Sequence, residues 1–179
     1  MALIDLIRSD FEAVNRKFSI GRLFLCLFFS YNMRPIILLR LRKVSCLSQF
    51  VRIYLRRKYQ IEYSPYLIIG SHFRMPHPRG ILLSARRIGN NCLIGQYVTI
   101  GGNNLQTMGG AKVPVIGDNV NIYAGAVVAG PIEIGHDTII GANTTVTKDV
   151  KSHTLIYSHI GISHKKVIVP GYKGAFYYE

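Results

Sequence analysis

Residues 115–147, VIGDNVNIYAGAVVAGPIEIGHDTIIGANTTVT, decide the fold of this chain. Every sixth residue of the stretch is a branched aliphatic: Ile116, Ile122, Val128, Ile134, Ile140 and Val146. A period of six does not match the turn of an α-helix, but it matches β-strands, because residues two apart lie on one face of a strand. Short strands joined by tight turns every six residues predict a three-sided coil of parallel strands, a β-helix of hexapeptide repeats.

The same period extends the predicted coil toward the N-terminus. It begins at Ile69, continues through Met75 and Ile81, shifts by one residue, and resumes at Ile88. The polar, glycine-rich segment 102–113 interrupts the period and is typical of a loop that leaves the coil at a corner. We therefore expect a mainly β chain with three parts: a short α-helical region at 1–60, the coil at 61–150, and a C-terminal cap at 151–179.

Residues 1–60 have the apolar spacing of helices. Residues 1–18 predict a short amphipathic helix, a second apolar segment runs from Gly21 to near Asn32, and a third helix begins at Pro35 and ends near Lys58. Basic residues alternate with apolar ones along and just before this third helix: Arg34, Arg40, Arg42, Lys43, Arg52, Arg56, Arg57 and Lys58. Two interpretations of it remain open, a solvated basic face on a packing helix and attachment to an anionic membrane surface.

The chain of 179 residues has a net charge of +13, which suggests anionic partners. It has no Trp and no recognisable nucleic-acid motif, so we do not expect nucleic acid as a partner. Cys26, Cys46 and Cys92 lack the spacing of a zinc site or a disulfide framework. The N-terminus lacks a signal-peptide pattern, and the longest apolar stretch is too short to span a bilayer. We therefore expect a cytoplasmic protein, with any peripheral attachment at the inner face of the membrane.

His77 is the candidate general base. It lies in RMPHPRGI, residues 74–81, where Pro76 and Pro78 restrict the backbone on both sides and can aim the imidazole outward. A neutral imidazole can accept a proton from a hydroxyl near pH 7. Glu62 lies fifteen residues earlier, close to one turn of the coil, so its carboxylate can orient the imidazole. From these residues alone, an ordinary surface histidine remains the alternative interpretation.

Over roughly residues 23–150 the chain resembles the hexapeptide-repeat acyltransferases, specifically the serine acetyltransferase-like branch with its polysaccharide O-acetyltransferase relatives. That branch has a D-I-H-P stretch, followed by H-x-x-G-I, V-T-L-G-G, a glycine-rich loop and P-x-I-G-D. The corresponding segments here are 62–65, 77–81, 98–102 and 114–118, and fifteen residues again separate the carboxylate from the histidine. The resemblance implies that His77 is the catalytic base and that Glu62 orients it.

The resemblance also implies a left-handed coil, a homotrimer that can pair into a dimer of trimers, and a catalytic domain with acetyl-CoA bound between subunits. No metal is implied. The backbone N–H groups of Gly101 and Gly102 would stabilise the oxyanion. The coenzyme would contact Gly101, Gly102, Lys112, Gly125, Gly141, Ala142 and Lys148. The acceptor would contact Tyr63, Phe73, Arg74 and Arg79.

The acceptor that we predict from the sequence is a carbohydrate. Serine acetyltransferases have an Asp before the catalytic His, which binds the substrate amine, and an Arg-His pair in the loop. Pro76, Lys112 and Val113 stand at these positions here, and an ammonium without its partner loses on the order of several kcal/mol. We therefore expect acetyl transfer to a sugar hydroxyl of a capsule, O-antigen or exopolysaccharide unit. The alternatives are a serine O-acetyltransferase of cysteine biosynthesis and a non-catalytic trimeric scaffold or binding module.

Overall fold

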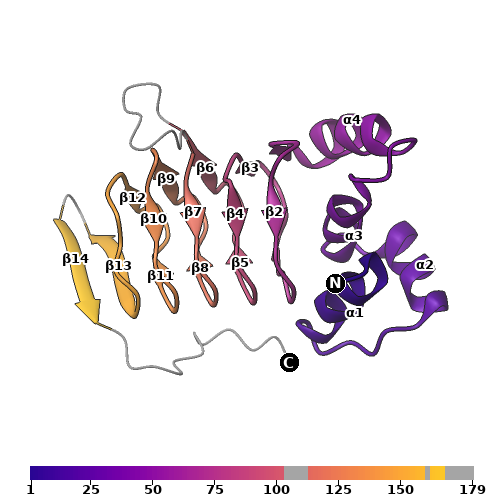
Figure 1. Ribbon diagram of the computed structural model, residues 1–179, viewed down its shortest axis with the longest axis horizontal. Coiled ribbons are helices and arrows are strands. Elements are labelled where there is room, and N and C mark those ends of the chain that lie inside the picture. The colour runs from indigo at the N-terminus through magenta and orange to yellow at the C-terminus, as the bar shows by residue number, and fades with distance from the viewer. Residues whose placement is uncertain (103–112, 160–161, 168–179) are drawn as a thin grey trace.

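Three sheets of short strands enclose a common core and give the chain a three-sided coil (Figure 1). The computed structural model describes residues 1–102, 113–159 and 162–167. Sheet one contains β1 (Glu62–Tyr63), β3 (Leu82–Leu83), β6 (Thr99–Gly101), β9 (Val127–Ala129) and β12 (Thr145–Val146). Sheet two contains β2 (Ile68–Ile69), β4 (Arg87–Ile88), β7 (Val115–Ile116) and β10 (Glu133–Ile134). Sheet three contains β5 (Leu93–Ile94), β8 (Asn121–Ile122), β11 (Ile139–Ile140), β13 (Thr154–His159) and β14 (Ile162–Val167).

Each strand of the coil pairs in parallel with the strand one turn later, and over residues 115–146 that strand lies three hexads further along the chain. Ile116 thus pairs with Ile134, Ile122 with Ile140, and Val128 with Val146. All six of these side chains are at most 5% exposed, so they form aliphatic layers between the sheets. The hexapeptide period, the parallel strands and the N-terminal helical region are therefore as predicted.

The register differs from the sequence prediction at one corner. Leu83, and not Ile81, pairs with Ile100 as the core residue of its strand. The chain takes eight positions from Met75 to Leu83, where a hexad has six, so the additional residues lie at 76–80. Pro76 and Pro78 have no N–H for a strand ladder, which explains why the chain bulges there.

The helical region consists of α1 (Leu3–Glu12), α2 (Ile20–Phe29), α3 (Met33–Leu41) and α4 (Ser48–Tyr59). The prediction of one helix from Pro35 to Lys58 is wrong, because residues 42–47 form turns between α3 and α4. Val44, Ser45 and Cys46 are weak helix formers, and the Ser48 hydroxyl donates to the Ser45 carbonyl at 3.1 Å. No single helix among the described residues is long and apolar enough to cross a membrane; α2 and α3 would pass together, but the chain bends by 110° between them.

A buried ion pair joins the helices to the first turn of the coil. Arg40 of α3 donates to both carboxylate oxygens of Asp10 in α1, at 2.7 and 2.8 Å. The same guanidinium donates to the carbonyls of Ile69 and Gly70, and Asp10 accepts the N–H of Phe73 at 2.8 Å. Burial raises the pKa of Asp10, while Arg40 and the Phe73 N–H act in the opposite direction.

Arg42 also donates inward, to the carbonyls of Leu39 and Leu67, and burial lowers its pKa to about 10. The sequence placed both Arg40 and Arg42 on a basic helix face, but the structure buries their side chains. The interpretation of a solvated or membrane-facing basic surface is therefore wrong for these two residues, whose cations bind the carboxylate and carbonyl groups around them.

The end of the described chain is a hairpin. Strand β13 continues sheet three in parallel with β11, and β14 returns antiparallel to β13. These strands lie within the predicted C-terminal cap at 151–179, of which residues 168–179 fall outside the described residues. Residues 103–112 of the predicted loop, Lys112 among them, also fall outside.

Candidate active site

His77 lies on the bulged corner 76–80, between the end of sheet three and the start of sheet one. Its side chain is exposed and its backbone φ is 50°. A positive φ is uncommon for a residue with a Cβ and persists where the surrounding structure holds it. Other corners of the coil also have such residues, among them Asn91 and Tyr97, so the bulge rather than φ distinguishes His77. The corner therefore presents the imidazole to solvent, where a ligand can reach it.

Glu62 begins sheet one beside the segment that follows His77. Its N–H donates to the Ile81 carbonyl at 2.9 Å, and its side chain is 57% exposed. The carboxylate lies 3.3 Å from Nε of Arg56, in the last turn of α4. Among the described residues, the His77 side chain makes no ion pair with Glu62. The structure therefore joins the Glu62 backbone to the segment that follows His77 and directs the Glu62 carboxylate to Arg56, a partner that the sequence analysis missed.

Tyr97 is a second residue at this corner that the predicted site did not include. Its N–H donates to the Arg79 carbonyl at 2.8 Å, and a Cβ added at Gly80 would collide with its ring. Gly80 has a φ of 65°, which glycine adopts without strain. The exposed Tyr97 ring therefore packs on the backbone three residues after His77. Six-residue periodicity places Tyr97 on a corner, but only the pairing of turns places it next to this one.

The four residues predicted to bind the acceptor do not form one surface. Phe73 is 1% exposed and lies in the hydrophobic core, so its assignment to acceptor binding is wrong. Tyr63 packs against that core, and burial raises its pKa. Arg74 is half-buried on sheet three, where Nη2 donates to Asn91 at 3.4 Å and burial lowers the pKa of the guanidinium. Arg79 is exposed on the His77 corner and is the one of the four that lies there.

The predicted coenzyme contacts flank sheet one. Gly125 and Ala142 lie on the same edge as His77, because Gly125 donates to Gln96 and Asn143 to Ala124 in successive turns. Gly141 lies at the end of β11, just before that edge. At the opposite edge lie Gly102, which follows β6, and Lys148, which follows β12; both are exposed. Gly101 is buried in β6, where its carbonyl accepts from Gly130 at 2.9 Å.

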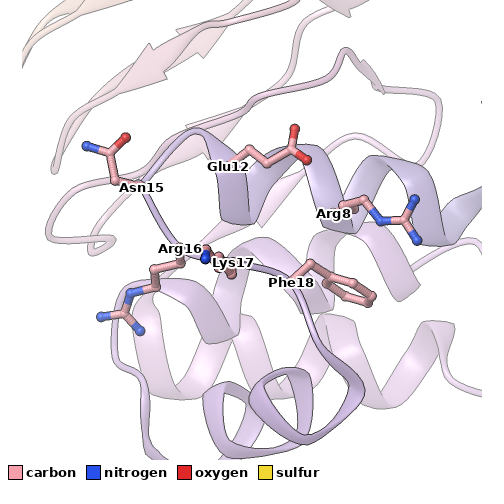
Figure 2. A pocket seen from close by; sticks show the side chains of 6 residues that line it. All are labelled: Arg8, Glu12, Asn15, Arg16, Lys17 and Phe18. Atoms are coloured by element: carbon pink, nitrogen blue, oxygen red, sulfur yellow. The ribbon is translucent and has the colours of Figure 1, made fainter.

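A pocket of about 420 Å³ lies elsewhere, in the helical region (Figure 2). Its lining comes from α1 and the segment after it: Arg8, Glu12, Asn15, Arg16, Lys17 and Phe18. None of the predicted site residues is among them. The candidate site around His77 is thus a surface of the single chain and has no part in this pocket.

Other reactive side chains of the described residues do not gather into a second site. No group of three or more His, Cys, Asp or Glu residues there could hold a metal ion. Cys26 and Cys92 are buried and Cys46 is exposed, each as a free thiol. Burial raises the pKa of Cys92 to about 12, which makes it a core residue and a poor nucleophile.

The sequence matches known proteins over the coil. Residues 114–148 match the family described as bacterial transferase hexapeptide (six repeats). The chain is 36% identical over 97 residues to the serine acetyltransferase of Mycobacterium tuberculosis, covering 54% of this chain and 42% of that protein. It is 32% identical over 133 residues to the serine acetyltransferase of Bacillus pumilus, covering 74% of this chain and 59% of that one. Over the coil, the chain is thus similar to the hexapeptide-repeat transferases, and among them to serine acetyltransferases.

Solved structures extend the likeness of this serine acetyltransferase-like chain to its helices. Neisseria gonorrhoeae serine acetyltransferase matches with a TM-score of 0.72 and 25% identity, over 96% of this chain and 67% of that one. A serine acetyltransferase solved in complex with CoA matches in fold, with a TM-score of 0.70 and 23% identity, over 93% of this chain and 69% of that one. The chain spans about half the length of the relatives that it matches in sequence.

These matches correct the predicted acceptor. The relatives named here and a further one from Staphylococcus xylosus, 40% identical over 97 residues, are all serine acetyltransferases. The prediction of acetyl transfer to a sugar hydroxyl is therefore wrong, and the matches favour the serine O-acetyltransferase that was its alternative. The inference had rested on three positions only, Pro76, Lys112 and Val113.

Proposed function

We propose that this chain is a serine O-acetyltransferase that uses acetyl-CoA as the acetyl donor and His77 as the general base. The observation that carries the proposal is the exposed imidazole on the bulged corner, in a coil similar to those of serine acetyltransferases. His77 would accept the proton of the serine hydroxyl while the oxygen attacks the thioester carbonyl. The tetrahedral intermediate would then expel the CoA thiolate, which takes the proton back from the imidazolium.

Glu62 would act on His77 as a positioning residue. Its side chain is more than half exposed and contacts Arg56, so it is not locked by packing in its present direction. A turn of the carboxylate toward His77 would orient the imidazole and stabilise the imidazolium that forms during the reaction. Arg56 would then be free, and its removal should not abolish turnover.

The two edges of sheet one would hold the coenzyme. Gly125, Gly141 and Ala142 offer backbone groups without large side chains on or next to the His77 edge, and Lys148 is an exposed cation for a phosphate at the other edge. Lys112, outside the described residues, would add a second cation. The N–H groups of Gly101 and Gly102 are the proposed donors to the oxyanion.

A left-handed coil and a homotrimer, with or without pairing of trimers, complete the proposal. The outward positions of sheet one between β3 and β12 hold uncharged residues: Leu82, Thr99, Val127 and Thr145. Such a face can pack against identical neighbours around a closed axis. Because the His77 surface is open in the single chain, a neighbouring subunit would supply the second wall of the coenzyme site.

Pro76 makes a specific prediction about serine binding. The carboxylate that precedes the base in serine acetyltransferases is missing, so the serine ammonium lacks that partner and the KM for serine should be high. Pro76→Asp should lower the KM by about 10–100-fold, the value of one hydrogen bond to a charged group. The matched control is Pro76→Asn, because asparagine has the shape of aspartate without its charge.

Thiol release from acetyl-CoA in the presence of L-serine tests the function. We expect turnover by the wild type and a loss of about 10²–10⁴ in kcat for His77→Ala, with CoA binding and the oligomeric state unchanged. Glu62→Gln should lower kcat by a smaller factor and should change the pH profile of kcat, because it changes the surroundings of the His77 imidazole and leaves the acetyl-CoA site intact. Binding of CoA without thioester cleavage across a panel of amino-acid hydroxyls would overturn the proposal and leave a non-catalytic scaffold.

A further inference from the structure

The side of α2 that faces solvent is apolar along its whole length. Its residues are large and strongly exposed: Ile20 (79%), Phe24 (64%), Leu25 (56%), Phe28 (59%) and Phe29 (81%). At 3.6 residues per turn they share one half of the helix, while Leu23, Cys26 and Leu27 on the other half pack into the core. The rings of Phe24 and Phe28 lie 4.9 Å apart. Single exposed apolar residues are ordinary, but a continuous apolar helix face indicates a binding surface.

This face lies at one end of the molecule. In Figure 1 α2 is on the outer side of the helical region, with α3 between it and the coil. Arg34, near the start of α3, donates from Nε to the Leu27 carbonyl at 2.5 Å and from Nη2 to the Phe28 carbonyl. These two carbonyls at the C-terminal end of α2 are therefore bonded internally and need no water as a partner.

The charge around α2 decides which partner fits. Between Ala13 and Ile61 the chain contains no Asp or Glu, while Arg22 lies exposed on α2 itself and Arg16 and Lys17 lie exposed on the segment that leads into it. Elsewhere in the helical region, α4 exposes the cations of Arg52, Arg57 and Lys58, while its Arg56 pairs with Glu62. Two copies of this chain joined through α2 would bring two cationic surfaces together with no carboxylate from either stretch, which like-charge repulsion disfavours. An anionic surface with an apolar interior matches both features.

We propose that α2 docks this chain on the surface of an anionic lipid bilayer, with its Phe face in the interfacial layer and the neighbouring cations against lipid phosphates. The helix has ten residues, about 15 Å at the usual rise, so it can lie in the plane of the interface but cannot span it. Partition of the aromatic and aliphatic side chains supplies the short-range part, and the cations supply a part that salt screens.

Vesicle flotation of the full chain tests the proposal. We expect binding to vesicles of phosphatidylcholine with phosphatidylglycerol, weaker binding to phosphatidylcholine alone, and a decrease as NaCl is raised. The double variant Phe24→Gln/Phe28→Gln keeps the net charge, and its affinity for the vesicles should fall by about tenfold or more. Tyr66→Gln is the matched control, since Tyr66 is 87% exposed on the coil and its replacement should leave binding unchanged.

A fluorescent residue can report the docked face directly, because the chain has no Trp. Phe28→Trp should show a blue shift on anionic vesicles and quenching by brominated acyl chains. Tyr66→Trp should show neither. Since both positions are exposed, the variants should fold as the wild type does, which circular dichroism verifies.

Three outcomes would overturn the proposal. One is a wild-type chain that does not float with anionic vesicles at low salt. Another is an oligomer of the wild type that vesicles do not dissociate but that light scattering shows to be lost in Phe24→Gln/Phe28→Gln. That result would make α2 a contact between copies. The last combines two results. The triple variant Arg16→Gln/Lys17→Gln/Arg22→Gln loses binding to RNA and to vesicles alike, and the fluorescence of Phe28→Trp does not shift on vesicles. Together they would indicate a general polyanion surface.

Discussion

The coil and the helical region of this chain are stabilised in different ways. In the coil each turn repeats the last, with backbone N–H groups donating to the next turn, as from Leu93 to Val120 and from Asn121 to Thr138. The helices join the coil through a shared hydrophobic core and, within it, through the buried Asp10–Arg40 pair and the carbonyls that it reaches. The difference teaches that the coil relies on many equivalent contacts, whereas the helical region adds a few buried polar groups that have no equivalent elsewhere.

Thiol labelling should separate the two regions by the largest factor. Cys46 is exposed and should react with iodoacetamide at pH 8 at the rate of a free thiol. Cys92 is buried in the coil and burial raises its pKa to about 12, so at pH 8 its thiol stays protonated until the coil opens. We expect Cys92 to react about 10³-fold more slowly than Cys46, with Cys26 of α2 between them. Mass spectrometry of labelled peptides gives the three rates, and equal rates for Cys26 and Cys92 would mean that the regions open together.

Arg40→Met should detach the helices. It leaves the Asp10 carboxylate buried without its cation, which costs about 3–5 kcal/mol. Hydrogen exchange should increase in α1 and α3 and stay unchanged in β7–β12. The control Arg56→Met breaks an exposed pair with Glu62 and should change stability by less than about 1 kcal/mol. Equal effects of the two variants would contradict the role assigned to the buried pair.

Ile134→Ala should weaken the coil and leave the helices attached. The side chain is 0% exposed between its neighbours in the layer, and its truncation should cost about 2–5 kcal/mol. Ile68→Ala, on the outward side of β2 at 54% exposure, is the matched control and should cost about 0.5 kcal/mol or less. Urea unfolding measures the stability of both variants. In hydrogen exchange of Ile134→Ala, a loss of protection in α1 as great as in β10 would argue against separate stabilisation.

Gln60→Gly should have the smallest effect, and a favourable one. Gln60 ends α4 with a φ of 55° and ψ of 37°, a conformation that glycine adopts without strain, so the change should stabilise by about 0.5–1 kcal/mol. Asn119→Gly tests the corresponding position in the coil, with a φ of 57°. There the side chain bonds to Asn91 and Asp137, both at 2.9 Å, so we expect a loss of stability. Thermal melts compare the two, and a gain from both would mean that the corner bonds contribute little.

Much of the fold could be predicted because the coil is locally repetitive. Its core residues follow from a six-residue period, and the phase shift near Ile81 already indicated an irregular corner. The sequence pattern placed that shift between Ile81 and Ile88, one hexad too late, because Ile81 is as apolar as Leu83 and fits the period as a core residue. Only the pairing of Leu83 with Ile100 assigns the additional residues to the corner that carries His77.

The candidate site was less predictable because its residues come from separate turns. His77 and its two prolines are visible in the sequence, but the contact of Glu62 with Arg56 depends on where α4 ends against β1. Phe73 and Tyr97 look alike as aromatic residues near the site, yet one fills the core and the other packs on Gly80.

The sequence by itself determined the three-sided coil, since branched side chains at every sixth position have one way to be buried together. It also determined that a histidine between two prolines interrupts that coil. Only the tertiary structure decided which cations are buried, which carboxylate partner is reached, and which helix face is left open. These depend on distances between segments far apart in the chain, and a local period carries no information about them.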